Sequence, residues 1–192
     1  MKKYLTALAL ITTFFLMTGN AVASPGFYIG LEAGPSAPKF SLKNVSGVEF
    51  KGSRSLLYGA KVGFKFLFLA VEGNLLTSSH DIPRRPVPVM PPEYIWEGKT
   101  VGVTYWGING KLFLPIPIVQ PYVMGGYGNY SVNIDTIGKD SNRGYNLGVG
   151  VEVKLGKLGL FAEGRYHKVK VDIEGELDMS NYTLTFGALY DF

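Results

Sequence analysis

The residues of this sequence best suited to acid–base chemistry are its two histidines, His80 and His167. A hydrolytic histidine needs a hydroxyl or thiol nucleophile within hydrogen-bond reach. Two positions after His167, on the same side of an extended chain, stands Val169 rather than a serine, and His80 is predicted to lie in a proline-rich loop. Cysteine is absent, and two histidines far apart in the sequence form no cluster of metal ligands. The sequence therefore predicts no catalytic residue, no metal site and no cofactor.

A second group of residues is suited to contact with anions. Segment 78–99 contains five prolines, which favour a stiff and extended chain. It carries Arg84 and Arg85, followed by Tyr94 and Trp96. Guanidinium groups match the geometry of phosphate and sulfate. These four residues are predicted as a contact surface for a polyanion, and the alternative is a solvated spacer whose aromatic side chains lie at an interface.

Charged residues of both signs occupy alternating positions of extended segments, among glycines. The residues on this face are Glu32, Lys61, Lys65, Glu72, Glu152, Glu163 and Arg165. The opposite face of the same segments is apolar, for example at Leu147, Val149 and Val151. A period of two is typical of strands whose faces meet different environments. We therefore predict a network of paired charges on one side of a sheet.

The alternation predicts eight strands. They cover residues 26–34, 54–66, 68–77, 100–113, 120–134, 144–155, 157–170 and 181–192. Several are 10 to 12 residues long, whereas soluble strands average about five or six residues and membrane-spanning strands need about 9 to 11. Within 100–113 the apolar face changes partway, which predicts a bulge or a shorter span. The boundary near 64–70 lacks polar turn residues.

The first 23 residues have the three parts of a cleaved export signal. A short basic start precedes a mainly apolar run of about 14 residues, and Ala21 and Ala23 supply the small residues of a cleavage site. The predicted domains are a signal peptide, 1–23, and one exported domain, 24–192. The formal net charge of the whole chain is only +4, so the composition gives nucleic-acid binding no support.

Side-chain size decides which face of the strands points inward. Eight strands close into a barrel just wide enough for side chains to fill, and the small and charged face fits that space better than the aromatic face. The competing prediction is a soluble barrel with its apolar faces inward. If lipid is outside, aromatic residues are expected at the two membrane interfaces. These are Tyr58, Phe64, Trp106, Tyr122, Tyr166, Tyr182 and Tyr190.

The connections between the predicted strands are unequal. Segments 35–54, 78–99 and 132–144 are long, whereas the return at 155–158 is tight. Outer-membrane barrels have short turns on the periplasmic side and longer loops outside. The sequence therefore predicts an all-β fold, an eight-stranded antiparallel up-and-down transmembrane β-barrel.

The last strand ends in a pattern of polar residue, glycine and two aromatic residues at Thr185, Gly187, Tyr190 and Phe192. With its eight alternating strands, the sequence resembles the outer-membrane β-barrel domain family, the small OmpA/OmpX-like barrels, over essentially all of 24–192. The resemblance implies location in the cell outer membrane and contact with its lipid and lipopolysaccharide. It also implies that the barrel-assembly machinery recognises the four terminal residues during insertion.

Three functions are compatible with such a barrel. We favour a structural or surface-interaction role with a closed lumen, in envelope integrity, adhesion or ligand contact through extracellular loops, because mixed-sign charges differ from a single-sign selectivity ring. Arg84 and Arg85 would then contact lipopolysaccharide phosphates or a host polyanion. The first alternative is a narrow pore for small or hydrophobic molecules, as in OmpW-like relatives. The second is a lipid A-modifying hydrolase, which the missing serine beside His167 disfavours.

Overall fold

The computed structural model describes residues 23–42, 49–51, 55–81, 100–134, 138–172 and 176–192. Nine strands occur in these ranges. They are β1 (Ala23–Leu42), β2 (Glu49–Lys51), β3 (Ser55–Leu67), β4 (Leu69–Asp81), β5 (Thr100–Phe113), β6 (Val119–Ile134), β7 (Gly138–Leu155), β8 (Leu158–Asp172) and β9 (Glu176–Asp191). Within the described part of the chain, no helix is long and apolar enough to span a bilayer.

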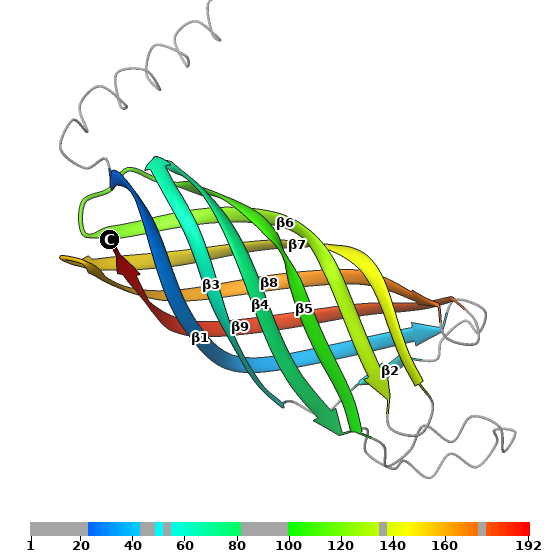
Figure 1. Cartoon of the computed structure of the whole chain (residues 1–192). Helices are drawn as coiled ribbons and strands as arrows, with labels where there is room; N and C mark the ends of the chain where they lie inside the picture. The colour runs from blue at the N-terminus through cyan, green and yellow to red at the C-terminus, as the bar shows by residue number, and fades with distance from the viewer. Residues whose placement is uncertain (1–22, 43–48, 52–54, 82–99, 135–137, 173–175) are drawn as a thin grey trace, which may run out of the picture.

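The strands form one antiparallel sheet that closes on itself. Each neighbours the next in sequence order from β3 to β9, and β1 pairs with both β3 and β9 (Figure 1). The short β2 pairs only with Lys39–Ser41 of β1, so eight strands form the wall. The predicted eight-stranded up-and-down barrel is confirmed. Closure pairs the backbone groups within the wall, as hydrocarbon requires.

The register of the sheet sets the tilt of the strands. A row of directly paired residues leaves β1 at Tyr28 and returns to β1 at Pro38, an offset of ten residues. Its intermediate members are Gly63, Glu72, Asn109, Gly126, Asn146, His167 and Asn181. With eight strands this offset gives a tilt of about 40° for ordinary strand spacing and rise. The tilt determines which inward side chains meet across the lumen.

The two ends of the barrel differ in their connections. At the end where the C-terminus lies, which we call the terminus side, short turns join β3 to β4, β5 to β6 and β7 to β8 (Figure 1). Positive φ angles occur in these turns, at Leu67 (57°), Ile118 (68°) and Gly156 (68°). The strand ends that flank 43–48, 82–99, 135–137 and 173–175 lie at the other end, the loop side. The turn near 64–70 falls within one residue of its predicted place.

Several wall strands extend further to the loop side than predicted. β1 continues to Leu42 and β2 occupies part of the predicted connection 35–54. β7 starts at Gly138, inside the predicted connection 132–144. The outward positions there include Lys39 and Ser141, so these extensions lack the apolar alternation from which the strands were predicted.

The bulge or shorter span predicted in 100–113 is also wrong. β5 keeps a continuous register with β4 and with β6 along its whole length. Val101 and Val103 point into the lumen together with Asn109 and Lys111, and all four are buried. The alternation changes character because the lumen itself is polar near one end of β5 and apolar near the other.

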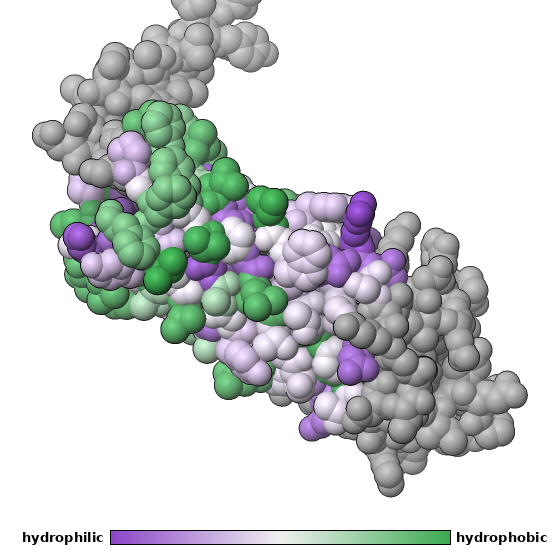
Figure 2. Space-filling model, in the orientation of Figure 1, coloured by the Kyte–Doolittle hydropathy of each residue, from purple (hydrophilic) through white to green (hydrophobic). Residues whose placement is uncertain are grey.

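The outer face is apolar over the terminus-side half of the wall (Figure 2). Of the seven aromatic residues predicted outside, Tyr122 is the exception: it is 3 % exposed and points into the lumen. The other six face outward; Trp106, at 60 %, is the most exposed of them. Toward the loop side the outward positions become polar, at Lys39, Thr77, Thr104, Asn129 and Lys168. The strands therefore continue past the apolar band.

Candidate functional site

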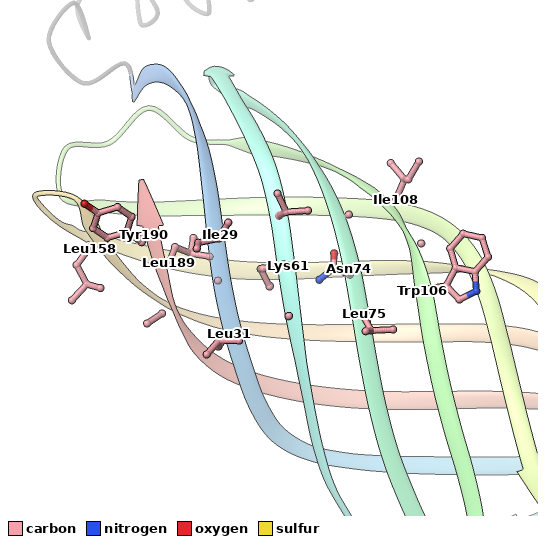
Figure 3. A pocket seen from close by; sticks show the side chains of 16 residues that line it. Ile29, Leu31, Lys61, Asn74, Leu75, Trp106, Ile108, Leu158, Leu189 and Tyr190 are labelled. Carbon is pink, nitrogen blue, oxygen red and sulfur yellow. The ribbon is translucent and has the colours of Figure 1, made fainter. Parts of the chain in front are cut away.

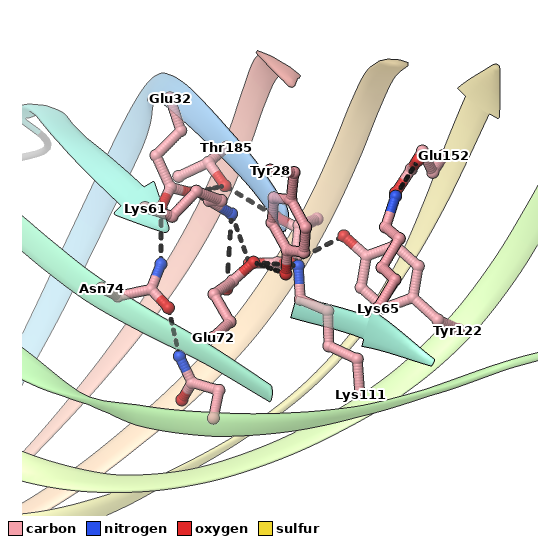
Figure 4. A network of polar contacts seen from close by, with 12 residues as sticks. Tyr28, Glu32, Lys61, Lys65, Glu72, Asn74, Lys111, Tyr122, Glu152 and Thr185 are labelled. Carbon is pink, nitrogen blue, oxygen red and sulfur yellow. Dashed lines mark hydrogen bonds and ion pairs between the residues drawn. The ribbon is translucent and has the colours of Figure 1, made fainter. Parts of the chain in front are cut away.

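The lumen contains a central cluster of six buried charged side chains, three acidic and three basic (Figure 4). They are Glu32, Lys61, Glu72, Lys111, Glu163 and Arg165. They come from β1, β3, β4, β5 and β8. Each occupies an inward position of its strand, so the period of two brings all six to the interior. The formal charge of this central cluster is zero.

Lys111 connects two acidic members of the central cluster. Its Nζ lies 2.8 Å from Glu72 Oε2 and 3.1 Å from Glu163 Oε2. Each of these carboxylates also accepts a hydrogen bond from a tyrosine, Glu72 from Tyr28 at 2.9 Å and Glu163 from Tyr122 at 2.7 Å. A buried carboxylate needs such partners because it has lost its hydration.

Arg165 and Lys61 hold the third acidic member, Glu32. Arg165 Nη2 lies 3.1 Å from both carboxylate oxygens of Glu32, and its Nε contacts Glu163. Lys61 Nζ lies 3.3 Å from Glu32 and 3.8 Å from Glu163. Thr185 donates a further hydrogen bond to Glu32 at 2.8 Å. All three carboxylates of the central cluster thus have at least two cationic neighbours.

Two glycines make room for the tyrosines. Tyr28 is the register partner of Gly63, and Tyr122 is the register partner of Gly150. A Cβ atom on either glycine would collide with the ring of the opposite tyrosine. Because these glycines have no side chain, each tyrosine ring can lie across the neighbouring strand, as aromatic residues often do over glycine in sheets. Each hydroxyl then reaches the carboxylate on the strand beyond.

A second, smaller group of charges lies at the terminus-side mouth of the lumen. Lys65 Nζ lies 2.5 Å from Glu152 and 3.7 Å from Asp191. Asp191 also pairs with Lys154 at 3.1 Å, and this pair is about one fifth exposed. The group contains two charges of each sign, so the mouth is neutral, as the central cluster is.

A chain of amides leads from the central cluster toward the loop side. Asn74 donates to Glu32 at 3.1 Å, Asn109 donates to Asn74, and Asn146 donates to Asn109 at 3.0 Å. Asn146 also donates to Tyr105 Oη at 2.9 Å. These buried amides connect the charged part of the lumen with an aromatic part.

The loop-side half of the lumen is filled mainly by apolar and aromatic side chains. This apolar cluster consists of Leu57, Leu76, Val101, Val103, Tyr105, Tyr130, Val132, Val169 and Met179. His167 lies against it: Tyr130 Oη is 2.9 Å from His167 Nδ1, and Thr183 Oγ1 is 3.3 Å from Nε2. His167 does therefore have hydroxyl neighbours, which β6 and β9 supply and which a search along its own strand misses.

His80 lies in β4 and not in the predicted proline-rich loop. Its side chain is 1 % exposed and faces the lumen. Its Nε2 lies 3.0 Å from Ser78 Oγ and 3.4 Å from Ser36 Oγ, and Ser36 also donates to Asn181 at 3.1 Å. Over the described residues, no three His, Cys, Asp or Glu side chains are grouped as a metal site would require.

The predicted lumen residues Glu32, Lys61, Glu72, Glu163 and Arg165 meet in the central cluster, whereas Glu152 lies at the mouth. Sequence reasoning left Lys111, Tyr28 and the three amides out of the network. Lys111 could have been predicted from the alternation in 100–113, because it lies on the same strand face as Asn109. The predicted contact residues Arg84, Arg85, Tyr94 and Trp96 lie outside the described residues.

The four residues of the terminal pattern lie on both faces of β9. Thr185 contacts Glu32 in the lumen, and Gly187 lies opposite the buried ring of Phe161. Tyr190 and Phe192 are exposed on the outside, with ring centres 5.4 Å apart. The pattern therefore combines two inward positions with two outward aromatic positions.

The outer wall carries an apolar groove of about 860 Å³ (Figure 3). It crosses the outer surface from β9 over β1, β3 and β4 to β5, and Leu31, Leu75, Trp106, Ile108 and Tyr190 are among its exposed lining residues. Because this is the apolar face of the barrel, we expect membrane hydrocarbon to fill the groove rather than a water-soluble ligand.

Solved structures with the same fold are outer-membrane barrels. Neisserial surface protein A (NspA) is 17% identical, with a TM-score of 0.63 over 88% of this chain and 100% of that one. Ail, the attachment invasion locus protein of Yersinia pestis, is 13% identical, with a TM-score of 0.50 over 87% and 99%. The outer membrane protease OmpT from Escherichia coli is 9% identical, with a TM-score of 0.50 over 91% and 100%. At these identities the likeness concerns the fold alone.

No curated protein sequence matches this chain significantly. The family described as outer membrane protein beta-barrel domain matches residues 6–192, which includes every strand of the wall. The structure agrees with this match, because the chain forms a closed barrel with an apolar outer band and is similar to solved outer-membrane barrels. The protein is therefore located in the outer membrane. The chain belongs to the outer membrane protein beta-barrel domain family.

Proposed function

We propose that this protein is a non-catalytic outer-membrane barrel whose lumen is sealed by its own side chains and whose activity lies in structural support and surface contact. The proposal rests chiefly on the neutral central cluster, in which three carboxylates and three cations pair with one another. An ion pathway is normally lined by charges of one sign or by free polar groups. Here Asn74, Asn109 and Asn146 also bond mainly to neighbouring lumen residues.

The surroundings of His167 support a non-catalytic role. Its hydroxyl neighbours, Tyr130 and Thr183, are at most 5 % exposed, and so is His167 itself. The apolar cluster lies beside them, and a substrate would have to displace it to reach the imidazole. Hydrolytic histidines combine an accessible nucleophile with an acidic partner. One structural neighbour is a protease, so the surroundings of His167, and not the fold, support this part of the proposal.

Surface contact is assigned to the outward connections because the wall faces lipid and the lumen is occupied. In such barrels the longer loops face the exterior, so the loop side is taken as extracellular. Segment 82–99 is the main candidate, with Arg84 and Arg85 for phosphate or sulfate groups and Tyr94 and Trp96 beside them. Its partner is proposed to be lipopolysaccharide or a host polyanion.

The geometry of the flanking strands allows a direct test of this segment. Asp81 and Thr100 are register partners, and Thr100 Oγ1 donates to Asp81 at 2.9 Å. A two-residue Asn-Gly turn can therefore replace 82–99 without changing the wall. The shortened variant and the Arg84→Ala/Arg85→Ala variant are expected to lose salt-sensitive binding to lipopolysaccharide or host cells. Equal binding by the intact and shortened barrels would refute a role of this segment.

The terminal pattern is proposed to serve insertion by the barrel-assembly machinery. Phe192 is 68 % exposed at the end of β9, so it adds little to the packing of the finished lumen. Deletion of Phe192 should slow assembly in cells while leaving the unfolding free energy of the refolded barrel nearly unchanged. Normal assembly of the deletion variant would contradict the proposal.

A further inference from the structure

Two lysines on the outer face lie in one row across three adjacent strands at the loop-side edge of the apolar band. Lys168 of β8 is the register partner of Ser180 of β9, and Ser180 is the register partner of Lys39 of β1. All three face outward by alternation with their buried neighbours. The two lysine Cα atoms are thus two strand spacings apart, about 10 Å, within which long side chains can reach one ligand.

Aromatic residues lie directly beneath this row. Tyr166 and Tyr182 are register partners with ring centres 5.0 Å apart. Lys39 Nζ lies 5.6 Å from the centre of the Tyr182 ring. Outward tyrosines at the edge of an apolar band are typical of the level where hydrocarbon meets headgroups. Lys39 and Lys168 therefore lie near the headgroup level, with Lys39 farther toward the loop side because the row rises around the tilted wall.

The charge at this edge is confined to one side of the barrel. On β7, β8 and β1 the first outward side chains past the apolar band are Arg143, Lys168 and Lys39. On β4, β5 and β6 the corresponding side chains are Thr77, Thr104 and Asn129, which are uncharged. Among the side chains that the structure describes, none of the three cations forms an ion pair with an acidic side chain, unlike Lys61, Lys65 and Lys111 of the lumen.

We propose that Lys39, Lys168 and Arg143, which we call the basic edge, bind a phosphate group of a lipid in the outer leaflet. The two lysines flank Ser180 in the register of the sheet, and the guanidinium of Arg143 on β7 adds a forked donor. Anionic headgroups are attracted by such cations at the membrane surface. The inference goes beyond the proposed function, because it involves the wall and not segment 82–99.

The structure provides a matched control at the opposite edge. Lys157 Nζ lies 5.8 Å from the centre of the outward Tyr190 ring, so it repeats the lysine–tyrosine contact of Lys39 and Tyr182. It belongs, however, to the short turn between β7 and β8, away from the row of Lys39 and Lys168. A general affinity of interfacial lysines for anionic lipid would involve Lys157 equally.

The test measures binding of bisphosphorylated lipid A to the refolded full chain in zwitterionic micelles. For Lys39→Gln/Lys168→Gln we expect about 10- to 30-fold weaker affinity, from roughly one kcal/mol per lysine, and for Lys157→Gln less than about a twofold change. The heat-induced gel shift verifies folding, and the two single variants replace the double variant if it does not fold. Dephosphorylated lipid A should bind the intact protein no better than it binds the double variant.

Four results would overturn the inference, and the last of them concerns segment 82–99. The first is equal affinity of the intact and double-variant proteins for the phosphorylated lipid. The second is equal affinity of the intact protein for phosphorylated and dephosphorylated lipid. The third is displacement of the lipid by an equal concentration of inorganic phosphate, which would assign the site to a soluble anion. The barrel with 82–99 replaced should keep its affinity; loss there would move the binding to that segment and leave the proposed surface role intact.

Discussion

Each half of the lumen contains a cluster of buried apolar side chains, but the charged residues of the central cluster all lie in the terminus-side half, although the same strands line both. On β5, Lys111 and Asn109 belong to the polar terminus-side half, whereas Val103 and Val101 belong to the apolar loop-side half. In the first half, individual atoms are matched: Lys111 pairs with Glu72 and Glu163, and Arg165 pairs with Glu32 and Glu163. In the second half, side chains mainly fill volume. The same wall therefore encloses a lumen that is filled in two different ways.

The difference predicts how each half responds to substitution. Removal of one member of a charge network leaves its partners buried without compensation. Removal of apolar atoms leaves a cavity whose effect depends on its size and not on charge. Four substitutions, ordered from the largest expected effect to the smallest, separate these two kinds of response.

Arg165→Ala should have the largest effect. It leaves Glu32 without its guanidinium partner and gives the central cluster a formal charge of −1, so we expect a loss of about 3–5 kcal/mol of unfolding free energy. Urea unfolding in lipid vesicles, followed by tryptophan fluorescence, measures this loss. The double variant Arg165→Met/Glu163→Gln, which removes one charge of each sign, should recover part of it. A loss below about 1 kcal/mol for Arg165→Ala would show that the network is not energetically coupled.

Leu76→Ala tests the apolar half. Leu76 is 1 % exposed in the apolar cluster, and its truncation should cost about 2–4 kcal/mol through the cavity that it leaves. The same unfolding measurement applies, repeated at low and high salt. Because no charge is involved, the two salt concentrations should give the same loss. A loss that depends strongly on salt would indicate that the apolar half is energetically coupled to the charged half.

Gly150→Ala tests the contact between glycine and tyrosine in the polar half. The added methyl group would force the Tyr122 ring away from Glu163, and we expect a loss of about 1–3 kcal/mol. Gly164→Ala is the matched control, because nothing lies within 4 Å of the position that its Cβ would take. Equal effects of both substitutions would mean that the loss comes from backbone flexibility alone.

Lys154→Gln should have the smallest effect. Its ion pair with Asp191 is similar in length to the pairs of the central cluster, at 3.1 Å, but both side chains are about one fifth exposed. We expect a loss of less than about 1 kcal/mol that decreases with added salt. A loss as large as that of Arg165→Ala would contradict the idea that burial makes the central pairs important.

The strands could be predicted from the sequence because lipid and lumen select opposite residue types at a period of two. The prediction failed where this contrast disappears. Beyond the apolar band, outward residues such as Lys39 and Ser141 no longer contrast with the inward face, so the predicted β1 ends too early and the predicted β7 starts too late. In β5 the inward residues Val101 and Val103 are apolar because they face the apolar loop-side part of the lumen. In the sequence this looks like a change of the apolar side from one strand face to the other.

The residues that face the lumen could be predicted more readily than the contacts between them. Parity places Glu32 and Arg165 inside, but their contact depends on the offset of ten residues around the barrel, which no local pattern encodes. Tyr122 was assigned to the membrane interface because of its residue type. Tyr122 alternates in step with Gln120 and Met124, which are both buried, and this alternation correctly places it in the lumen. Histidine neighbours such as Thr183 also come from other strands and follow only from register.

Single-channel recording in planar bilayers tests the central claim most directly. The refolded full chain should insert and show no stable conductance, because its paired charges and the apolar cluster occupy the lumen in two successive layers. The heat-induced gel shift confirms that the protein added to the bilayer is a folded barrel. A steady, porin-like conductance of the intact chain would contradict the sealed lumen and favour the narrow pore.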